Sequence, residues 1–201
     1  MATRDSPLIP LLAHPAAPSD GAQRVAARAE LLSPESLRFQ YVMEADLRLV
    51  RIPAPVADAG TADKLWTHTC FEAFVGLPES PRYLELNFAP SGQWAAYRFD
   101  SYRQGMAPAV DTAARLAVRR SDERLELQAE VRLGESLFFP VPHPEVPGCP
   151  RVRIALTAVV EDREGRLSYW ALRHPPGRPD FHHPESFSLA LEIPAKPLNP
   201  P

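Results

Sequence analysis

Apolar residues recur at every second position through most of this chain. The alternation is clearest in two successive segments, formed by Val25, Ala27, Ala29 and Leu31 and then by Leu37, Phe39, Tyr41 and Met43. Successive side chains of a β-strand point to opposite faces, so a period of two predicts strands with one buried face. The chain has 24 prolines against 9 glycines, which strengthens the prediction because proline interrupts helices and suits stiff loops between short strands.

The same patterning divides the chain into roughly nine to eleven strands separated by turns, which is typical of a β-sandwich. We expect strands at residues 25–31, 37–43, 69–75, 83–88, 93–99, 115–120, 125–131, 151–160, 166–172 and 186–193, with a short further one around 47–49. Proline-rich or polar composition predicts long loops at 51–64, 138–150 and 173–185. The sequence therefore predicts an all-β, antiparallel fold.

Length and charge narrow the classes of protein that this chain fits. A chain of 201 residues suits a single domain, and we expect its folded core at about 6–193 with a flexible tail at 194–201. The net charge of −3 and the pI near 6.1 argue against a nucleic-acid or anionic-membrane partner. Two cysteines do not make a disulfide framework in a chain of this size.

The first twenty residues do not match a secretion signal. Asp5 cancels the charge of Arg4, and Pro7 and Pro10 interrupt the apolar patch that follows. No stretch approaches the roughly 20 apolar residues of a membrane-spanning helix. We therefore expect the protein in the cytoplasm.

The segment NFAPSGQWAAYRFD, residues 87–100, predicts a hairpin with an unusual outer face. A turn with two or four unpaired residues would place odd positions of the first strand beside even positions of the second. One face would then carry Tyr83, Glu85, Asn87, Trp94, Ala96 and Arg98, and the core face Leu84, Leu86, Phe88, Ala95, Tyr97 and Phe99. In this register Glu85 and Arg98 are close enough for a cross-strand ion pair.

An indole surrounded by carboxylate, amide and guanidinium groups suits a sugar. The ring stacks on C–H surface while the polar groups bind hydroxyls. The alternative is structural, in which Trp94 covers the end of the sheet or packs beneath the loop 51–64.

Four longer motifs carry a resemblance to a known family: KLWTHTCFEAFVG, RYLELNFAPSGQWAAYRFDSYRQGM, YWALRHP and PDFHHPESFSLAL. The chain resembles the bacterial DOMON-like proteins, which in turn look like relatives of family 9 carbohydrate-binding modules, over roughly residues 6 to 193. The resemblance implies a jelly-roll-like β-sandwich that binds sugar or haem without chemistry. It also implies an aromatic clamp containing Trp66 together with Trp94 or Trp170.

Together these observations predict a non-catalytic module for a carbohydrate or glycoconjugate. The predicted ligand-binding residues are Trp66, Glu72, Glu85, Asn87, Trp94 and Arg98. A sandwich used only for protein contact is a further alternative. The oligomeric state is left open.

Haem is the main alternative ligand. Resemblance to haem-binding DOMON domains implies a methionine, Met43 or Met106, with a histidine among His68, His174, His182 and His183. Met43 follows the strand alternation and is expected in the core.

Metal binding and hydrolysis are weaker alternatives. His174, Asp180 and His182 crowd one loop, but their spacing matches no standard metal site, and they serve equally well as hydrogen-bonding residues that fix the loop. Glu72 and Glu85 on neighbouring strands offer the carboxylate pair of a glycoside hydrolase, which needs separations of about 5.5 or about 6.5–9.5 Å. We expect no metal, no cofactor and no enzymatic activity.

Overall fold

The computed structural model describes residues 7–18, 21–134 and 151–193, and these form an all-β protein. The strands are β1 (Ile9–Ala13), β2 (Ala22–Ser33), β3 (Ser36–Ala45), β4 (Cys70–Gly76), β5 (Tyr83–Phe88), β6 (Trp94–Phe99), β7 (Ala107–Pro108), β8 (Ala113–Arg120), β9 (Arg124–Arg132), β10 (Arg151–Glu161), β11 (Leu167–Ala171) and β12 (Leu189–Glu192). Two single-turn 3₁₀-helices, η1 (Leu65–Thr67) and η2 (Pro184–Ser186), are the helical elements of this part of the chain. Neither could span a membrane.

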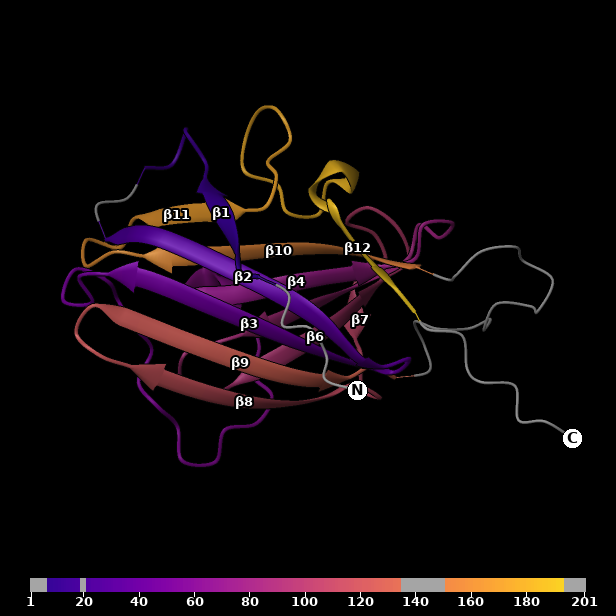
Figure 1. Ribbon diagram of the computed structural model, residues 1–201, viewed down its shortest axis with the longest axis horizontal. Helices are drawn as coiled ribbons and strands as arrows, with labels where there is room; N and C mark the ends of the chain where they lie inside the picture. The colour runs from indigo at the N-terminus through magenta and orange to yellow at the C-terminus, as the bar shows by residue number, and fades with distance from the viewer. Residues whose placement is uncertain (1–6, 19–20, 135–150, 194–201) are drawn as a thin grey trace, which may run out of the picture.

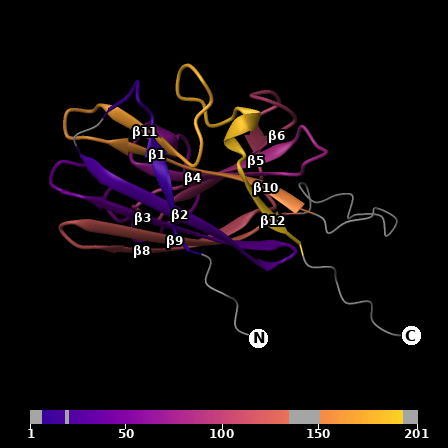
Figure 2. The ribbon, with the colours of Figure 1, turned by 45° about the horizontal axis from the view of Figure 1, so that its top comes forward.

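The strands form one antiparallel sheet that curls into a β-sandwich, as the sequence predicts (Figure 1). The first half of the sheet has the order β7-β6-β5-β4-β10-β11, and the second half has the order β2-β3-β9-β8. β1 joins the halves because it pairs with β2 near its beginning and with β11 near its end. β12 pairs with β10 near the beginning of β10, as Figure 2 shows from a second direction.

The expected strands agree with the observed ones apart from several short elements. β1 and β7 escape the sequence pattern because β1 contains Pro10 and β7 has only two residues. Residues 47–49 form a turn, and the last strand begins at Leu189 because η2 occupies the chain before it. The expected loop 138–150 and tail 194–201 lie outside the described residues.

The main hydrophobic core lies between the two halves of the sheet. β3 contributes alternate residues, among them Leu37, Phe39, Tyr41 and Met43, each fully buried. β5 contributes Leu84, Leu86 and Phe88, also buried. The alternation in the sequence therefore identifies the inner face of these strands correctly.

A second apolar cluster lies on the outer face of the first half of the sheet. Its buried residues are Phe74, Tyr83, Ala95, Tyr97, Phe99, Ala155, Val159, Ala171 and Phe181. Trp66 of η1 and Phe187 of the segment before β12 pack against it. Because chain segments cover this outer face, β4 and β5 are buried on both faces, and the outer face can hold a recessed site.

Candidate ligand-binding cavity

The hairpin between β5 and β6 closes with an odd number of residues, which sets its two faces. Phe88 lies opposite Trp94, and the backbone N–H of Ala89 donates to the carbonyl of Gln93 over 2.9 Å. Residues 90–92 form the tip, where Gly92 has a φ of 90° that favours glycine. A three-residue tip pairs positions of equal parity, whereas the two- and four-residue turns expected from the sequence pair opposite parities.

The expected composition of the hairpin's polar face is therefore wrong in its second strand. Glu85 lies opposite Tyr97 and Asn87 lies opposite Ala95, while Arg98 lies opposite Leu84. Ala95, Tyr97 and Phe99 share the outer face with Glu85. Because Arg98 projects from the other face, the expected ion pair between Glu85 and Arg98 does not form.

Trp94 and Trp170 lie away from the outer face. Trp94 is partly buried against the main core, and its backbone pairs with Gly60 and Ala62 in the loop 51–64. This is the structural alternative expected for Trp94. Trp170 is buried in the main core, where its Nε1 donates to the Ser168 hydroxyl over 3.1 Å. Of the three tryptophans, Trp66 is the one that lines a cavity on the outer face.

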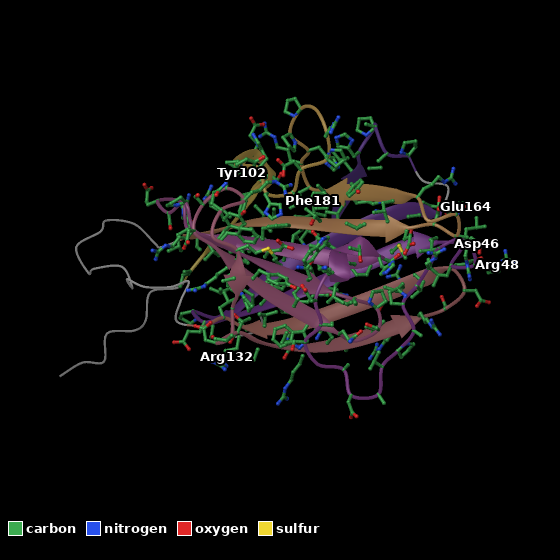
Figure 3. The ribbon with its side chains drawn as sticks, turned by 180° about the vertical axis from the view of Figure 1, so that it is seen from behind. Asp46, Arg48, Tyr102, Arg132, Glu164 and Phe181 are labelled. Atoms are coloured by element: carbon green, nitrogen blue, oxygen red, sulfur yellow. The ribbon has the colours of Figure 1, made fainter. Side chains whose placement is uncertain are left out.

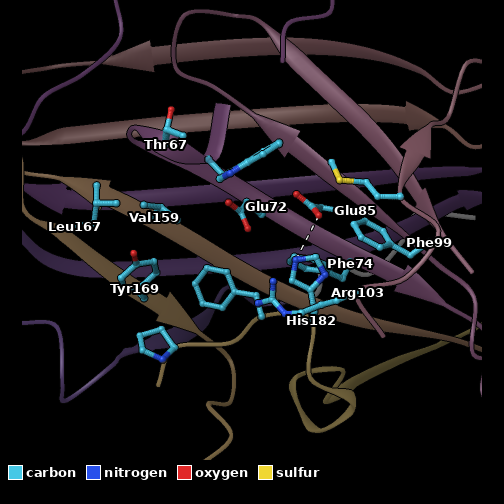
Figure 4. Close-up of a pocket in the computed structure, with 14 residues that line it drawn as sticks. Thr67, Glu72, Phe74, Glu85, Phe99, Arg103, Val159, Leu167, Tyr169 and His182 are labelled. Atoms are coloured by element: carbon cyan, nitrogen blue, oxygen red, sulfur yellow. Dashed lines mark ion pairs between the residues drawn. The ribbon is translucent and has the colours of Figure 1, made fainter. Parts of the chain in front are cut away.

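This cavity has a volume of about 490 Å³ and combines aromatic walls with ionisable groups (Figure 4). Its aromatic lining consists of Trp66, Phe74, Phe99, Tyr169 and Phe181. Its ionisable lining consists of Glu72, Glu85, Arg103 and His182. The expected residues Trp66, Glu72 and Glu85 are thus brought together. Asn87 lies on the same face beside Glu85, while Trp94 and Arg98 are not among the lining residues.

Glu72 is the least compensated group in the cavity. It lies on β4 opposite Asn87 of β5 and Thr157 of β10. The residue is 3% exposed, and no described residue hydrogen-bonds its Oε1. Burial, followed by the nearby charge of Glu85, raises the pKa of Glu72 well above its usual range. A buried acceptor without a donor is costly, so a ligand that supplies a donor here would bind favourably.

Glu85 is the diagonal neighbour of Glu72 across the β4–β5 pair and has partial compensation. The Asn87 amide nitrogen donates to Glu85 Oε1 over 2.8 Å, and His182 Nε2 lies 3.6 Å from Oε2. Burial raises the pKa of Glu85, while the hydrogen bond from Asn87 and the charge of Arg103 act in the opposite direction. Asn87 is itself fully buried, so it positions Glu85.

His182 lines the cavity and is held neutral there. Its Nδ1 shares a hydrogen bond of 2.8 Å with the Tyr83 hydroxyl. Burial, together with the charge of Arg103, lowers the pKa of His182 to about 4. At neutral pH this side chain therefore brings no positive charge to the two glutamates.

Asp180 fixes the loop that carries His182. It accepts hydrogen bonds from the Arg103 guanidinium over 2.8 Å and from the backbone N–H of His182 over 3.1 Å. His174 lies elsewhere, with its Nε2 on the carbonyl of Leu12 at 2.8 Å. Across residues 7–18, 21–134 and 151–193, no three His, Cys, Asp or Glu side chains are grouped as a metal site. Asp180 and His182 thus have the loop-fixing contacts considered as their alternative role.

Sequence reasoning missed most of the cavity's lining. Tyr169 is adjacent to Trp170, and strand alternation places it on the outer face once Trp170 is assigned to the core. Arg103 and Phe181 belong to irregular segments that carry no periodic signal. Met106 lines the cavity and is half-exposed, whereas Met43 is fully buried in the main core, as expected from its position.

Comparison with known proteins supports the fold. No protein-family model matches the chain, and no curated protein matches its sequence. The chain is similar to a crystal structure from Bacteroides uniformis ATCC 8492 that is provisionally named a carbohydrate-binding protein. The TM-score is 0.59 at 15% identity, over 92% of this chain and 85% of the other. At this identity the similarity establishes a shared β-sandwich, and membership of the DOMON-like proteins stays a prediction.

Proposed function

We propose that this chain is a non-catalytic β-sandwich that binds a saccharide in the cavity of the outer face. The observation that carries the proposal is the unpartnered Oε1 of Glu72 beside aromatic walls. A sugar matches both the unpartnered oxygen and the aromatic walls, since its hydroxyls donate hydrogen bonds and its C–H faces pack on aromatic rings. The provisional name of the structural neighbour is consistent with this choice.

The lining residues divide into two roles in this proposal. Trp66 and Tyr169 offer ring surface for the sugar, and Tyr97 supports the indole of Trp66 from an edge-on position with ring centroids 5.5 Å apart. Glu72 and Glu85 accept hydrogen bonds from hydroxyl groups, and Arg103 can donate to a ring or hydroxyl oxygen. The volume of about 490 Å³ lies within the range of small-ligand sites.

Binding without hydrolysis is the better explanation of the carboxyl pair. Glu72 and Glu85 are diagonal neighbours on adjacent strands, with backbone positions typically about 7–8 Å apart, so their carboxyl groups are near enough for an inverting glycosidase to be considered. That mechanism needs one carboxyl protonated and the other ionised as a base. In this cavity burial raises the pKa of both Glu72 and Glu85, so burial disfavours the ionised form that the base must have.

Calorimetric titration with a panel of mono- and disaccharides tests the proposal. We expect binding by the unmodified protein and its loss in Trp66→Ala, because the stacking surface is removed. Trp94→Phe is the matched control, since it also removes an indole but at a site in the main core, and it should bind normally. A variant Trp66→Ala that binds as tightly as the unmodified protein would refute the assigned site.

Haem is the second candidate, because Met106 and His182 line the same cavity. It is less well supported, since both ring nitrogens of His182 face protein groups, Tyr83 and Glu85. A Soret band that appears on titration with haem and disappears in His182→Asn would favour this candidate over the saccharide.

A further inference from the structure

The cavity holds two buried carboxyl groups without a matching positive charge. Arg103 and His182 are the basic residues among the described lining. The guanidinium of Arg103 is already paired with Asp180 at 2.8 Å, and His182 is neutral for the reasons given above. Glu72 and Glu85 are 3% and 5% exposed, respectively. Among the described residues, no lysine or arginine forms an ion pair with Glu72 or Glu85, and the dashed contact of Glu85 in Figure 4 leads to His182.

The walls next to these carboxyl groups are aromatic, and aromatic faces attract cations. Trp66 and Tyr169 line the cavity with Phe181, whose ring is edge-on to Tyr169 with centroids 5.9 Å apart. The negative face of an aromatic ring stabilises a desolvated ammonium group, and indole does so best. Carboxyl groups and aromatic rings that line one cavity are thus complementary to an ammonium group that is carried on an apolar framework.

We propose that the saccharide bound in this cavity is an amino sugar whose protonated amine lies between Glu72 and Glu85, an inference that rests on the proposed saccharide binding. A hydroxyl group can satisfy Glu72 Oε1 but brings no charge, so it does not offset the cost of ionising either buried carboxyl group. An ammonium group donates three hydrogen bonds and offsets the charge that burial makes costly. The carboxyl proton displaced on binding passes to the solvent buffer.

The experiment compares sugars that differ at one substituent. Glucosamine, galactosamine and mannosamine are each titrated by calorimetry against the parent hydroxyl sugar and the N-acetylated form, at mildly acidic pH so that the amine is charged. For at least one of the three stereoisomers, we expect the amine to bind about tenfold or more tightly than the parent hydroxyl sugar and the N-acetylated form. Titrations in buffers of different ionisation enthalpy should show proton release for the amine and none for the neutral sugars.

Two variants test whether Glu72 and Glu85 cause the preference for the amine sugar. Glu72→Gln keeps the size of the side chain and removes its charge, so it should lower the affinity for the amine sugar to about that for the hydroxyl sugar. Glu85→Gln should reduce the preference in the same direction and serves if Glu72→Gln does not fold. Glu164→Gln is the matched control on an exposed turn, with a side chain 69% exposed, and should keep the full preference.

The outcomes separate this inference from the function on which it rests. Equal binding of amine and hydroxyl sugars, or a preference that persists in both Glu72→Gln and Glu85→Gln, overturns the inference and leaves saccharide binding intact. If no sugar of the panel binds, whether charged or neutral, the saccharide function itself fails and the amino-sugar assignment fails with it.

Discussion

Glu72 lowers the stability of the folded state but can accept a hydrogen bond from a ligand. Its carboxyl group is buried on a central strand, and one oxygen has no partner among the described residues. Side chains of this kind are uncommon in a protein interior unless a ligand or a metal satisfies them. This single acceptor therefore indicates more about function than Trp94, the hairpin residue that the sequence pattern emphasises.

Replacing Glu72 should stabilise the ligand-free protein at neutral pH. Because the pKa of Glu72 is raised by folding, the folded state holds the proton after the unfolded chain has lost it, and stability falls as the pH rises above about 4.5. We expect the free energy of unfolding of Glu72→Gln to be higher than that of the unmodified protein by about 1 kcal/mol or more at pH 7. The difference should be smaller below pH 4. Urea unfolding at several pH values measures this difference. A Gln variant that is less stable at every pH would contradict it.

His182 should contribute the opposite dependence. Its pKa is lowered to about 4 in the folded state, so between roughly pH 6.5 and 4 the unfolded chain binds a proton that the folded state does not. The contribution to stability is therefore present at neutral pH and is lost on acidification through this range. The difference in unfolding free energy between the unmodified protein and His182→Asn should change across this window. A difference that is independent of pH would show that His182 does not titrate as described.

The β5–β6 hairpin shows, at the scale of an element, why part of the site could not be predicted. The strand positions and the inner face of β5 follow from alternation alone. The face of β6 depends on whether the tip holds an odd or an even number of residues, and the segment APSG is compatible with both. The structure brings Glu72 and Glu85, on β4 and β5, into the cavity with Asn87 beside them, whereas Trp94 and Arg98 on β6 lie outside its lining.

The inner face of β5 provides a direct test of this register. Leu86 is fully buried in the main core opposite Ala96, and Leu86→Ala should cost about 2–5 kcal/mol of unfolding free energy. Arg98→Ala is the control, because Arg98 is exposed and should change stability by less than about 0.5 kcal/mol. Thermal or urea unfolding of both variants distinguishes the two positions. A cost below about 1 kcal/mol for Leu86→Ala would mean that this face is not packed.

At the scale of the whole molecule, the sandwich was predictable and the covering of its outer face was not. The sandwich follows from a period of two repeated over many short segments. The cover comes from the segment between β11 and β12, which brings Phe181 and His182 over strands that lie about a hundred residues earlier in the chain. Such long-range contacts of irregular backbone carry no periodic pattern. Figure 3, which labels Phe181 above the strands, shows this segment from the side opposite to Figure 1.

Because β4 and β5 are buried on both faces, neighbouring residues of each strand face different surroundings. Along each strand, one set of alternate positions packs in the main core, while Glu72, Phe74 and Glu85 of the intervening set line the cavity. Under the proposed function, exchange of Glu72 or Glu85 would change what the cavity binds and leave the main core unchanged. Ligand selectivity would then depend on residues within strands, in addition to those of the variable loops.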